Sequence, residues 1–477
     1  MNQAIILAAG EGSRMKSSLI KVLHKINGKA MLKYVLDATE RAGFDKRYLI
    51  VGNNKDKVIE EFSSDKSIEF IEQKMGPGEP YGTGYAASLA KGHIKNDDNV
   101  LVIFGDTPLV DEEILKDFLK FHKDNDNNMT ILSAILDNCD GYGRIVRDKD
   151  NNLTKIVEQK DANDEELKIK EVNSGIYCFK GKDFLDAINN LKNDNVKKEY
   201  YLTDAVAYLL SKNKKVDAYI SDDQNIALGV NNQLDLSKIE EIVRKKIITK
   251  WMIEGVYFKN PSNVYIEENV KIGRDVEIYP DVILEGNTII EDNVKIYGYT
   301  RINNSHIAKG VTIESSLIED SFIDERTKVG PNAHLRPNSK IGKDCKVGNF
   351  VEIKNASLGD GTKAGHLAYV GDADVGSNVN IGCGVIFANY DGKNKYRSKV
   401  EDNAFIGSNS NLVAPVAIGE NAYVAAGSTI ITEVKKDSLS IARARQVDKI
   451  DWVKNKKIWR KKNEFISRTT KSFNRKR

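Results

Sequence analysis

The sequence predicts a chain of two structural classes, α/β in its first half and all-β in its second. Three observations support this: a length of 477 residues, apolar runs that alternate with helical stretches up to residue 228, and a six-residue aliphatic period from residue 262. A chain of this length exceeds one ordinary hydrophobic core. We therefore expect an α/β domain, a connecting helix with its linker, a β-solenoid and a basic tail, at residues 1–228, 229–261, 262–448 and 449–477.

Apolar runs in the first half have the length and composition of buried strands. They are Ala4–Leu7, Tyr48–Val51 and Val100–Phe104, with helical stretches at 28–42 and 84–92 between them. This alternation is typical of βαβ units around a mainly parallel sheet. Such a sheet binds ligands at the carboxyl ends of its strands, so we expect functional residues directly after these runs.

Residues 233–252 combine helical spacing of apolar residues with pairs of opposite charge. This pattern predicts the helix that connects the two halves.

A six-residue aliphatic repeat organises the second half. Gly often follows the aliphatic residue, as in Ile341-Gly342 and Ile406-Gly407. An inward-pointing aliphatic residue and a Gly that permits a sharp corner suit a parallel β-solenoid with three hexads in each triangular coil and about nine coils. The repeat has aliphatic residues at 266, 272, 278, 284, 290, 296, 302, 329, 335, 341, 347, 353, 406, 412, 418, 424 and 430.

The hexad phase is interrupted in two ways. Steps of five residues, from Ile313 to Ile318 and from Val370 to Val375, are slips that one corner can absorb. The run 388–402 does not fit a solenoid wall, and we expect it to project as a loop.

The composition is that of a globular protein, with 40% hydrophobic and 30% charged residues. No apolar stretch approaches the roughly 18 residues of a membrane span, and no basic region precedes the first apolar residues, so we expect a cytoplasmic protein without a signal peptide. Cys139, Cys178, Cys345 and Cys383 form no CxxC pair and are expected to be reduced thiols.

Basic residues are concentrated at the C-terminus. Residues 454–477 hold eleven Lys or Arg and one Glu, which leaves about −7 for the rest of a chain whose net charge is +3. Such a tail suits RNA, membranes or acidic partners, but no aromatic-spaced recognition motif accompanies it. We expect a solvated tail and no nucleic-acid partner.

A glycine loop, Leu7–Met15, follows the first predicted strand. Its small residues allow backbone N–H groups to approach a triphosphate, and Arg14 and Lys21 supply positive charge near the reacting phosphorus. Met15 breaks the dinucleotide-binding pattern, and no GK[ST] ending is present. The loop alone is also compatible with a tight turn.

Asp106 follows the buried strand Val100–Phe104. A carboxylate at this strand end can hold Mg²⁺ on a nucleotide phosphate, because hard cations prefer oxygen ligands. The alternative is a structural Asp that caps a turn.

His366 lies in a solenoid hexad shortly before Asn389. A neutral imidazole can accept a proton from an attacking nucleophile, although a corner His bonded to the backbone is the alternative. Arg336 and Lys354 are one coil apart, so we expect them on one face, where two stacked cations attract a phosphate. We expect the rungs to bring both cations beside His366.

These motifs together resemble known enzyme families. The first half resembles the sugar-nucleotide pyrophosphorylase domain, and the second resembles the hexapeptide-repeat acyltransferases. Nearly the whole chain is similar to the bifunctional N-acetylglucosamine-1-phosphate uridyltransferase / glucosamine-1-phosphate N-acetyltransferase family. The residues that carry the resemblance are 7–15, 21–24, 82–84, 104–106, 141–145, 157–162, 173–175, 229–232, 365–369 and 389–392.

The resemblance implies a fold and two reactions. The fold is a Rossmann-like nucleotidyltransferase domain joined to a left-handed parallel β-helix that forms a homotrimer. The solenoid would transfer acetyl from acetyl-CoA to glucosamine 1-phosphate. The first domain would then transfer uridylyl from UTP to N-acetylglucosamine 1-phosphate and release pyrophosphate. The product would be a precursor of peptidoglycan and lipopolysaccharide.

For the uridylyl site, the resemblance implies that Arg14 and Lys21 are catalytic and that Asp106 and Asn231 hold Mg²⁺. The residues that would bind UTP or the sugar nucleotide are Leu7, Ala8, Ala9, Gly10, Lys21, Gln73, Gly82, Thr83, Gly143, Glu158, Asn173 and Asn231. The chain departs from the family at Ile20 and Ala30, where prolines are common, and in the longer segment 73–81. Base specificity is therefore less defined than the phosphate chemistry.

For the acetyl site, the resemblance implies that His366 is the general base. Glucosamine 1-phosphate would contact Arg336, Lys354, Tyr369, Asn380 and Lys395, and acetyl-CoA would contact Cys383, Asn389, Tyr390, Ser408, Ala426 and Arg443. Cys383 stands where Ala is common. A packing role is favoured over a reactive thiol, because no adjacent base is evident.

Two other functions are compatible with parts of the sequence. One is a sugar-1-phosphate nucleotidyltransferase with a non-catalytic, trimerising solenoid, but the His366 constellation is present. The other is a metal-dependent solenoid such as a γ-type carbonic anhydrase, or a trimeric scaffold, but His306, His334 and His366 are dispersed.

Overall fold

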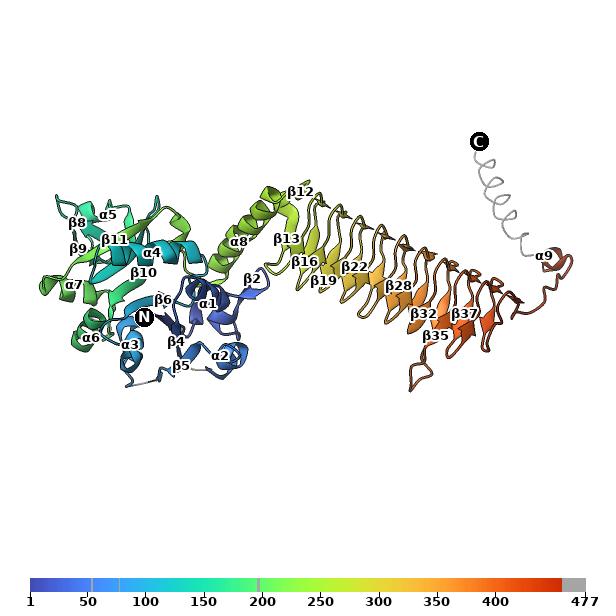
Figure 1. Ribbon diagram of the computed structural model, residues 1–477, viewed down its shortest axis with the longest axis horizontal. Helices are drawn as coiled ribbons and strands as arrows, with labels where there is room; N and C mark the ends of the chain where they lie inside the picture. The colour runs from blue at the N-terminus through green and yellow to red at the C-terminus, as the bar shows by residue number, and fades with distance from the viewer. Residues whose placement is uncertain (53–54, 77, 195–197, 457–477) are drawn as a thin grey trace, which may run out of the picture. The chain divides into compact units, whose positions relative to one another are not determined.

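The computed structural model describes residues 1–52, 55–76, 78–194 and 198–456 (Figure 1). Contacts divide the chain into two compact units, Met1–Gly310 and Val311–Arg477. The basic tail predicted at 449–477 lies outside the described residues from 457 onward; before that point, helix α9 spans Trp452–Asn455.

The first unit contains the predicted, mainly parallel sheet. All three predicted apolar runs lie in its strands. The strands are β1 (Asn2–Leu7), β4 (Lys46–Val51), β5 (Ile68–Glu72), β6 (Asn99–Phe104), β7 (Met129–Ile135), β8 (Arg144–Arg147), β9 (Leu153–Val157), β10 (Glu171–Lys180) and β11 (Val216–Ser221), and a separate hairpin is formed by β2 (Lys25–Ile26) and β3 (Lys29–Ala30). The strand order is β11-β7-β10-β6-β1-β4-β5, and β10 is antiparallel to both neighbours.

Helices pack on both faces of this sheet. Ile6 of β1 belongs to one core with Leu36, and its neighbour Ile5 belongs to the opposite core with Ala87. Burial on both faces explains why β1 is a continuous apolar run. The helices are α1 (Met31–Arg41), α2 (Lys55–Phe62), α3 (Thr83–Ser88), α4 (Glu112–Asp124), α5 (Asp164–Leu167), α6 (Gly181–Asn190), α7 (Asp204–Ser211) and α8 (Gln233–Ile253).

The connecting helix predicted at 233–252 is confirmed as α8. Its Ile239 and Val243 share a core with Met15 of the glycine loop. The β2–β3 hairpin also holds the first solenoid coil, because Nδ2 of Asn27 donates to the Ile266 carbonyl at 3.1 Å. Through these contacts the first compact unit extends beyond residue 262. The domain boundaries predicted above stay a prediction.

The hexad repeat forms three walls of short parallel strands. In the first unit the walls run β12-β15-β18, β13-β16-β19 and β14-β17-β20. These strands are β12 (Tyr257–Phe258), β13 (Val264–Ile266), β14 (Lys271–Ile272), β15 (Glu277–Ile278), β16 (Val282–Glu285), β17 (Ile289–Ile290), β18 (Lys295–Ile296), β19 (Arg301–Asn303) and β20 (His306–Ile307).

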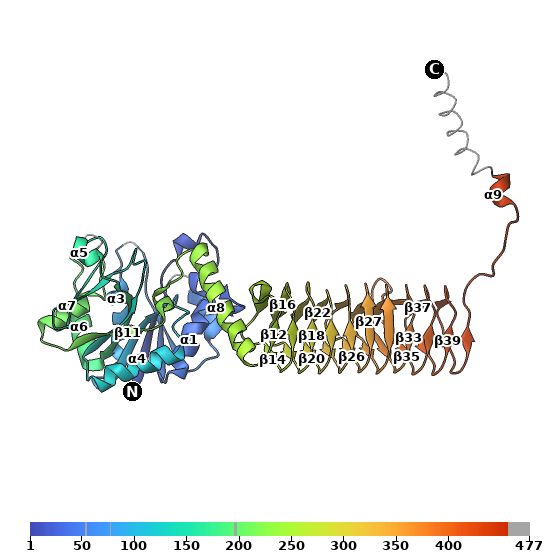
Figure 2. The ribbon, with the colours of Figure 1, turned by 90° about the horizontal axis from the view of Figure 1, so that it is seen from above.

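The second unit continues the same pattern. Its walls run β21-β24-β27-β30-β33-β36-β39-β41, β22-β25-β28-β31-β34-β37-β40 and β23-β26-β29-β32-β35-β38 (Figure 2). These strands are β21 (Thr312–Ile313), β22 (Leu317–Glu319), β23 (Phe322–Ile323), β24 (Lys328–Val329), β25 (His334–Leu335), β26 (Lys340–Ile341), β27 (Lys346–Asn349), β28 (Glu352–Lys354), β29 (Ser357–Leu358), β30 (Lys363–His366), β31 (Tyr369–Gly371), β32 (Ala373–Val375), β33 (Asn380–Ile381), β34 (Ile386–Ala388), β35 (Ser398–Val400), β36 (Phe405–Ile406), β37 (Asn411–Val413), β38 (Ala417–Ile418), β39 (Tyr423–Val424), β40 (Thr429–Ile430) and β41 (Leu439–Ser440).

The predicted inward-pointing residues form the solenoid core. Ile278, Leu335, Ile353 and Ile406 are each fully buried. The six-residue period therefore predicts both the strands and their buried side.

The corner role predicted for the hexad glycines is seen at Gly330, whose φ is 104°, but not at every position. Gly342 and Gly407 do not adopt the left-handed conformation; instead, a Cβ at either position would press against the backbone of the next coil. The left-handed corners are mostly Asn or Asp, such as Asn338 and Asp344. The hexad glycine is needed for close coil-to-coil approach.

The predicted projecting loop is shorter than 388–402. Residues 389–397 leave the wall beside β35 (Figure 1), but Ser398–Val400 form β35 and pair with β32. Ser398 and Val400 are buried on either side of exposed Lys399. This alternation suits a strand, and the loop's charged residues obscured it in the sequence. Among the described residues, no helix combines the length and the apolar character that a membrane crossing requires.

Candidate functional site

Two cavities that share Gly10 and Lys21 lie at the carboxyl ends of β1 and β6. The larger, of about 460 Å³, is also lined by Gly12, Arg14, Lys74 and Asn231. The smaller, of about 240 Å³, is lined by Leu7, Ala8, Ala9, Gly10, Lys21, Gln73, Gly82, Thr83 and Asp106, among others. The structure thus brings together the residues predicted to bind a nucleotide and its metal.

Four polar side chains from distant parts of the sequence meet between these cavities. Nζ of Lys21 forms an ion pair with Oδ2 of Asp106 and lies 3.4 Å from Oδ1 of Asn231. Nη2 of Arg14 donates to the same Asn231 oxygen at 2.8 Å. The side chains of Lys21 and Asp106 are only 12% and 21% exposed, so water screens the pair weakly.

The oxygen atoms in this cluster fit Mg²⁺. Asp106 supplies a carboxylate, Asn231 supplies an amide oxygen, and both already face a cation, the Lys21 ammonium. A hard divalent cation prefers such oxygen donors and retains water. Within the described residues, no group of three or more His, Cys, Asp or Glu side chains is arranged to hold a metal.

Only glycine fits at position 82, in the wall of the smaller cavity. Its φ is 118°, and a Cβ at this position would collide with the backbone of Tyr200. The Leu202 N–H donates to Oγ1 of Thr83 at 3.1 Å. Residues 82–84 and 200–202 therefore form one continuous surface.

This packing also reveals two lining residues that sequence reasoning missed. Glu199 and Tyr201 line the smaller cavity beside Gly82 and Thr83. No glycine motif or strand end marks the segment 199–203 in the sequence. Only the contact with Gly82 identifies it.

The predicted sugar-binding residues Gly143, Glu158 and Asn173 are neighbours. The Asn173 N–H donates to the Gly143 carbonyl at 2.9 Å, and a Cβ on Gly143 would lie 3.5 Å from Oε1 of Glu158. Desolvation, with a smaller contribution from the charge of Asp161, raises the pKa of Glu158 above its ordinary value. Desolvation raises the pKa of Tyr201, which lines the smaller cavity, and the charges of Glu199 and Glu158 add to this rise.

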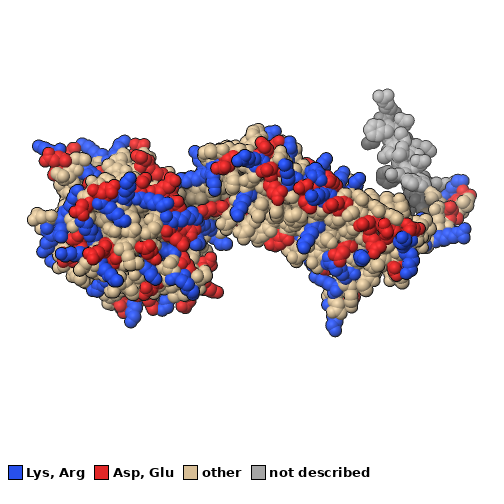
Figure 3. All heavy atoms as spheres, viewed as in Figure 1, with Lys and Arg blue, Asp and Glu red and all other residues tan. Residues whose placement is uncertain are grey.

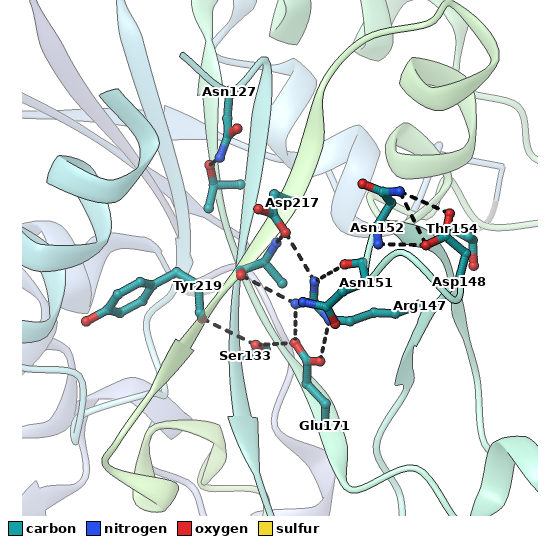
Figure 4. A network of polar contacts seen from close by, with 12 residues as sticks. Asn127, Ser133, Arg147, Asp148, Asn151, Asn152, Thr154, Glu171, Asp217 and Tyr219 are labelled. Atoms are coloured by element: carbon teal, nitrogen blue, oxygen red, sulfur yellow. Dashed lines mark hydrogen bonds and ion pairs between the residues drawn. The ribbon is translucent and has the colours of Figure 1, made fainter. Parts of the chain in front are cut away.

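A polar network holds the β8–β9 hairpin, which is flanked by two of the predicted sugar-binding residues, Gly143 and Glu158 (Figure 4). Arg147 of β8 donates to both carboxylate oxygens of Glu171 at 2.8 and 2.9 Å and to Asp217 at 3.3 Å. Such charge-assisted, two-point bonds are directional. They link β8 to β10 and β11 and so fix the hairpin on the sheet.

In the second unit, Arg336 and Lys354 lie one rung apart on one wall, as predicted. The Arg336 N–H donates to the Ile353 carbonyl at 2.8 Å, and Nη1 of Arg336 pairs with Glu352 at 2.8 Å. Contact with Lys395 is the largest cause that lowers the pKa of Lys354, followed by desolvation and the charges of Lys395 and Arg336. Three cations converge here, and Glu352, which sequence reasoning missed, partly neutralises them.

His366 lies on a different wall, which corrects the expectation that the rungs bring it beside the two cations. It ends β30 and pairs in register with Asn349, whereas Lys354 belongs to β28. The reason is spacing: His366 follows Lys354 by two hexads, and a wall recurs only every third hexad. Asn380, in β33, lies on the wall of His366.

Tyr369 lies on the wall of Lys354. It pairs in register with Glu352, and its hydroxyl is 3.5 Å from Nδ2 of Asn389. Tyr369 therefore connects the cation cluster to the predicted acetyl-CoA residues.

The other predicted acetyl-CoA residues follow one corner of the solenoid. The N–H after Ser408 donates to the Cys383 carbonyl at 2.7 Å, and the N–H after Ala426 donates to the Ser408 carbonyl at 2.9 Å. Arg443 lies beside the glycine after Ala426. The four residues form a strip on successive coils, with Cys383 partly buried.

The loop 389–397, which carries Tyr390 and Lys395, is anchored at both ends. At its start, Asp372 accepts hydrogen bonds from the amides of Asn389 and, at 2.5 Å, Asn355. At its end, Arg397 pairs with Asp374 at 2.6 Å. The tip that projects in Figure 3 carries basic side chains. Buried Asp372, also missed in the sequence, is therefore a candidate positioning residue.

Replacing Asp372 with Ala should lower kcat/KM of the predicted acetyl transfer by about tenfold or more, because the buried amide of Asn389 and the half-buried amide of Asn355 lose their acceptor and the loop start is released. Asp372→Asn, which retains one acceptor oxygen, should recover part of this. The measurement is the split between kcat and the KM values for both substrates. Asp344→Ala, which removes a surface carboxylate paired with Arg326, is the matched control; an equal loss there would contradict a positioning role.

Comparison with known families supports two kinds of domain. The model of the MobA-like NTP transferase domain matches residues 4–138. The model of the bacterial transferase hexapeptide, with six repeats, matches residues 269–304 and 397–432. The model of the GMPPB C-terminal domain matches residues 317–390.

Curated relatives match almost the full chain. A bifunctional protein GlmU of Clostridioides difficile (strain 630) is 48% identical over 454 residues, covering 95% of this chain and 98% of the relative. The bifunctional protein GlmU of Acetivibrio thermocellus is 46% identical, with 97% and 99% covered. That of Geobacillus sp. (strain WCH70) is 44% identical, with 94% and 97% covered.

Proposed function

The chain belongs to the family of bifunctional GlmU proteins, and from this premise we propose how its residues carry out two reactions. It is a glucosamine-1-phosphate N-acetyltransferase and an N-acetylglucosamine-1-phosphate uridyltransferase. Its hexapeptide solenoid is a left-handed β-helix. The order proposed is acetyl transfer first and uridylyl transfer second.

In acetyl transfer, the amine of glucosamine 1-phosphate attacks the thioester carbonyl of acetyl-CoA. His366 accepts the proton that the amine loses, and coenzyme A leaves as its thiol. Arg336, Lys354 and Lys395 bind the sugar phosphate through their convergent charges. Tyr369 and Asn380 contact the sugar, and the strip from Cys383 to Arg443, with Asn389 and Tyr390, binds acetyl-CoA.

We infer a homotrimer in which neighbouring chains complete this site. His366 and the cations are on different walls of one chain. Phe350 and Leu367 at the corners and Ile386 on the wall are 60%, 58% and 45% exposed, and exposed apolar groups of this kind mark interaction surfaces. A second chain packed there would supply the missing side of the site.

In uridylyl transfer, an oxygen of N-acetylglucosamine 1-phosphate attacks the α-phosphorus of UTP and expels pyrophosphate. Arg14 and Lys21 neutralise the phosphates, the backbone of Leu7–Gly10 lies along them, and Gln73, Gly82 and Thr83 seat the base. Gly143, Glu158 and Asn173 bind the sugar. Mg²⁺ held by Asp106 and Asn231 would supply charge neutralisation on the nucleotide phosphates.

The observation that carries this assignment is that Arg14 and Lys21 converge in one place with Asp106 and Asn231, from three separate segments of the chain. The test is to incubate the pure protein with glucosamine 1-phosphate, acetyl-CoA, UTP and Mg²⁺, omitting each in turn, and to identify the products by mass. Omission of acetyl-CoA should stop both products, whereas omission of UTP should leave N-acetylglucosamine 1-phosphate. Uridylyl transfer to supplied N-acetylglucosamine 1-phosphate without acetyl transfer would favour a non-catalytic solenoid.

A further inference from the structure

The Lys21 ammonium lies in the position that suits a metal cation. It forms an ion pair with the Asp106 carboxylate and is 3.4 Å from the Asn231 amide oxygen. These are the two side chains with the oxygen donors for Mg²⁺. An ammonium and a divalent cation cannot share this position, because their charges repel strongly at such distances.

The same lysine also borders the cavity assigned to the phosphates. Lys21 lines the larger cavity together with Arg14 and Lys74, and it lines the smaller one with Asp106. Its long side chain has several rotatable bonds, so its ammonium can exchange one anionic partner for another. A triphosphate in the larger cavity offers that second partner.

We propose that Lys21 occupies the cation position at Asp106 until a nucleoside triphosphate draws its ammonium away, so that free divalent metal binds weakly and metal with nucleotide binds tightly. This inference rests on the metal and nucleotide assignment proposed above. Metal and nucleotide then strengthen each other's binding by the same factor, because coupling between two ligands is reciprocal. Lys21 is the element that couples them.

The proposal predicts opposite changes in two affinities when Lys21 is replaced. In Lys21→Met, Mn²⁺ should bind about tenfold more tightly without nucleotide, because the competing charge is gone. Metal-free UTP should bind more weakly, because the phosphates lose a cation. Mn²⁺ affinity is measured by electron paramagnetic resonance of the free ion and UTP affinity by calorimetry, neither of which requires turnover. Lys21→Gln, which keeps a polar head, repeats the measurement if Lys21→Met does not fold.

Lys74→Met is the matched control, because Lys74 lines the larger cavity but not the smaller one with Asp106. Its loss should leave the metal-only affinity nearly unchanged. An equal rise in Lys74→Met, or no rise in Lys21→Met and Lys21→Gln, would overturn the proposal. Asp106→Asn distinguishes the metal assignment from the role of Lys21. If Asp106→Asn leaves Mn²⁺ affinity unchanged, the metal assignment itself fails. If Asp106→Asn weakens Mn²⁺ binding but Lys21→Met does not strengthen it, only the role of Lys21 is rejected.

Discussion

Replacing Asp106 with Ala will reduce UTP-dependent pyrophosphate release by about a thousandfold or more while acetyl transfer continues. The carboxylate is the only charged oxygen donor named in the proposed metal site, and it also holds the Lys21 ammonium. Its loss leaves the developing phosphate charge without organised neutralisation, which is the dominant requirement of phosphoryl transfer. The measurement is pyrophosphate release from UTP and N-acetylglucosamine 1-phosphate, beside acetyl transfer in the same preparation.

Asp111→Ala is the control for loss of a nearby acidic residue. Asp111 caps helix α4 by accepting from the Ile114 N–H at 3.2 Å. Its loss should cost about 1 kcal/mol of stability and little activity. Retention of pyrophosphate release in Asp106→Ala, or loss of acetyl transfer in a protein that is still trimeric, would show that the two-site assignment is wrong.

The second large effect concerns His366. His366→Ala should lower acetyl transfer by about a hundredfold to ten-thousandfold, because no other group is assigned to take the amine proton. UTP-dependent pyrophosphate release should be unchanged, since the described residues that line the nucleotide cavities lie between Leu7 and Asn231. The rate is measured by release of the coenzyme A thiol.

His334→Ala provides a matched comparison on the same solenoid. His334 is another coil histidine, half-buried where His366 is exposed, and it pairs with Glu319 at 3.0 Å on another rung. We expect its removal to leave acetyl transfer nearly intact. Equal activity of the two variants would remove His366 from the mechanism.

The proposed trimer connects these predictions to the different walls on which His366 and Lys354 lie in one chain. Mixing His366→Ala chains with Lys354→Ala chains should therefore restore part of the acetyl transfer if neighbouring chains complete the site. This result would not be expected from a site contained in one chain.

Local sequence patterns were sufficient to predict many of the strands, buried residues and candidate site residues of this protein. The side on which a strand residue points depends only on its position in the repeat, because successive side chains alternate between the two faces. The six-residue repeat therefore predicted Ile278, Leu335 and Ile406 as core residues, and all three are buried. The glycine loop and Asp106 were found because each directly follows an apolar strand. Helix α8 followed from its own spacing and charge pairs.

Tertiary structure decided the features that depend on contacts between distant segments. Lys21 pairs with Asp106, and Arg14 donates to Asn231. Glu199 and Tyr201 line the smaller cavity, and Ser398–Val400 form a strand of the solenoid. His366 lies on a different wall from Arg336 and Lys354. Periodicity specifies which way a residue points relative to its own backbone. Which distant residue it then meets depends on how whole strands and coils pack, and no local pattern contains that information.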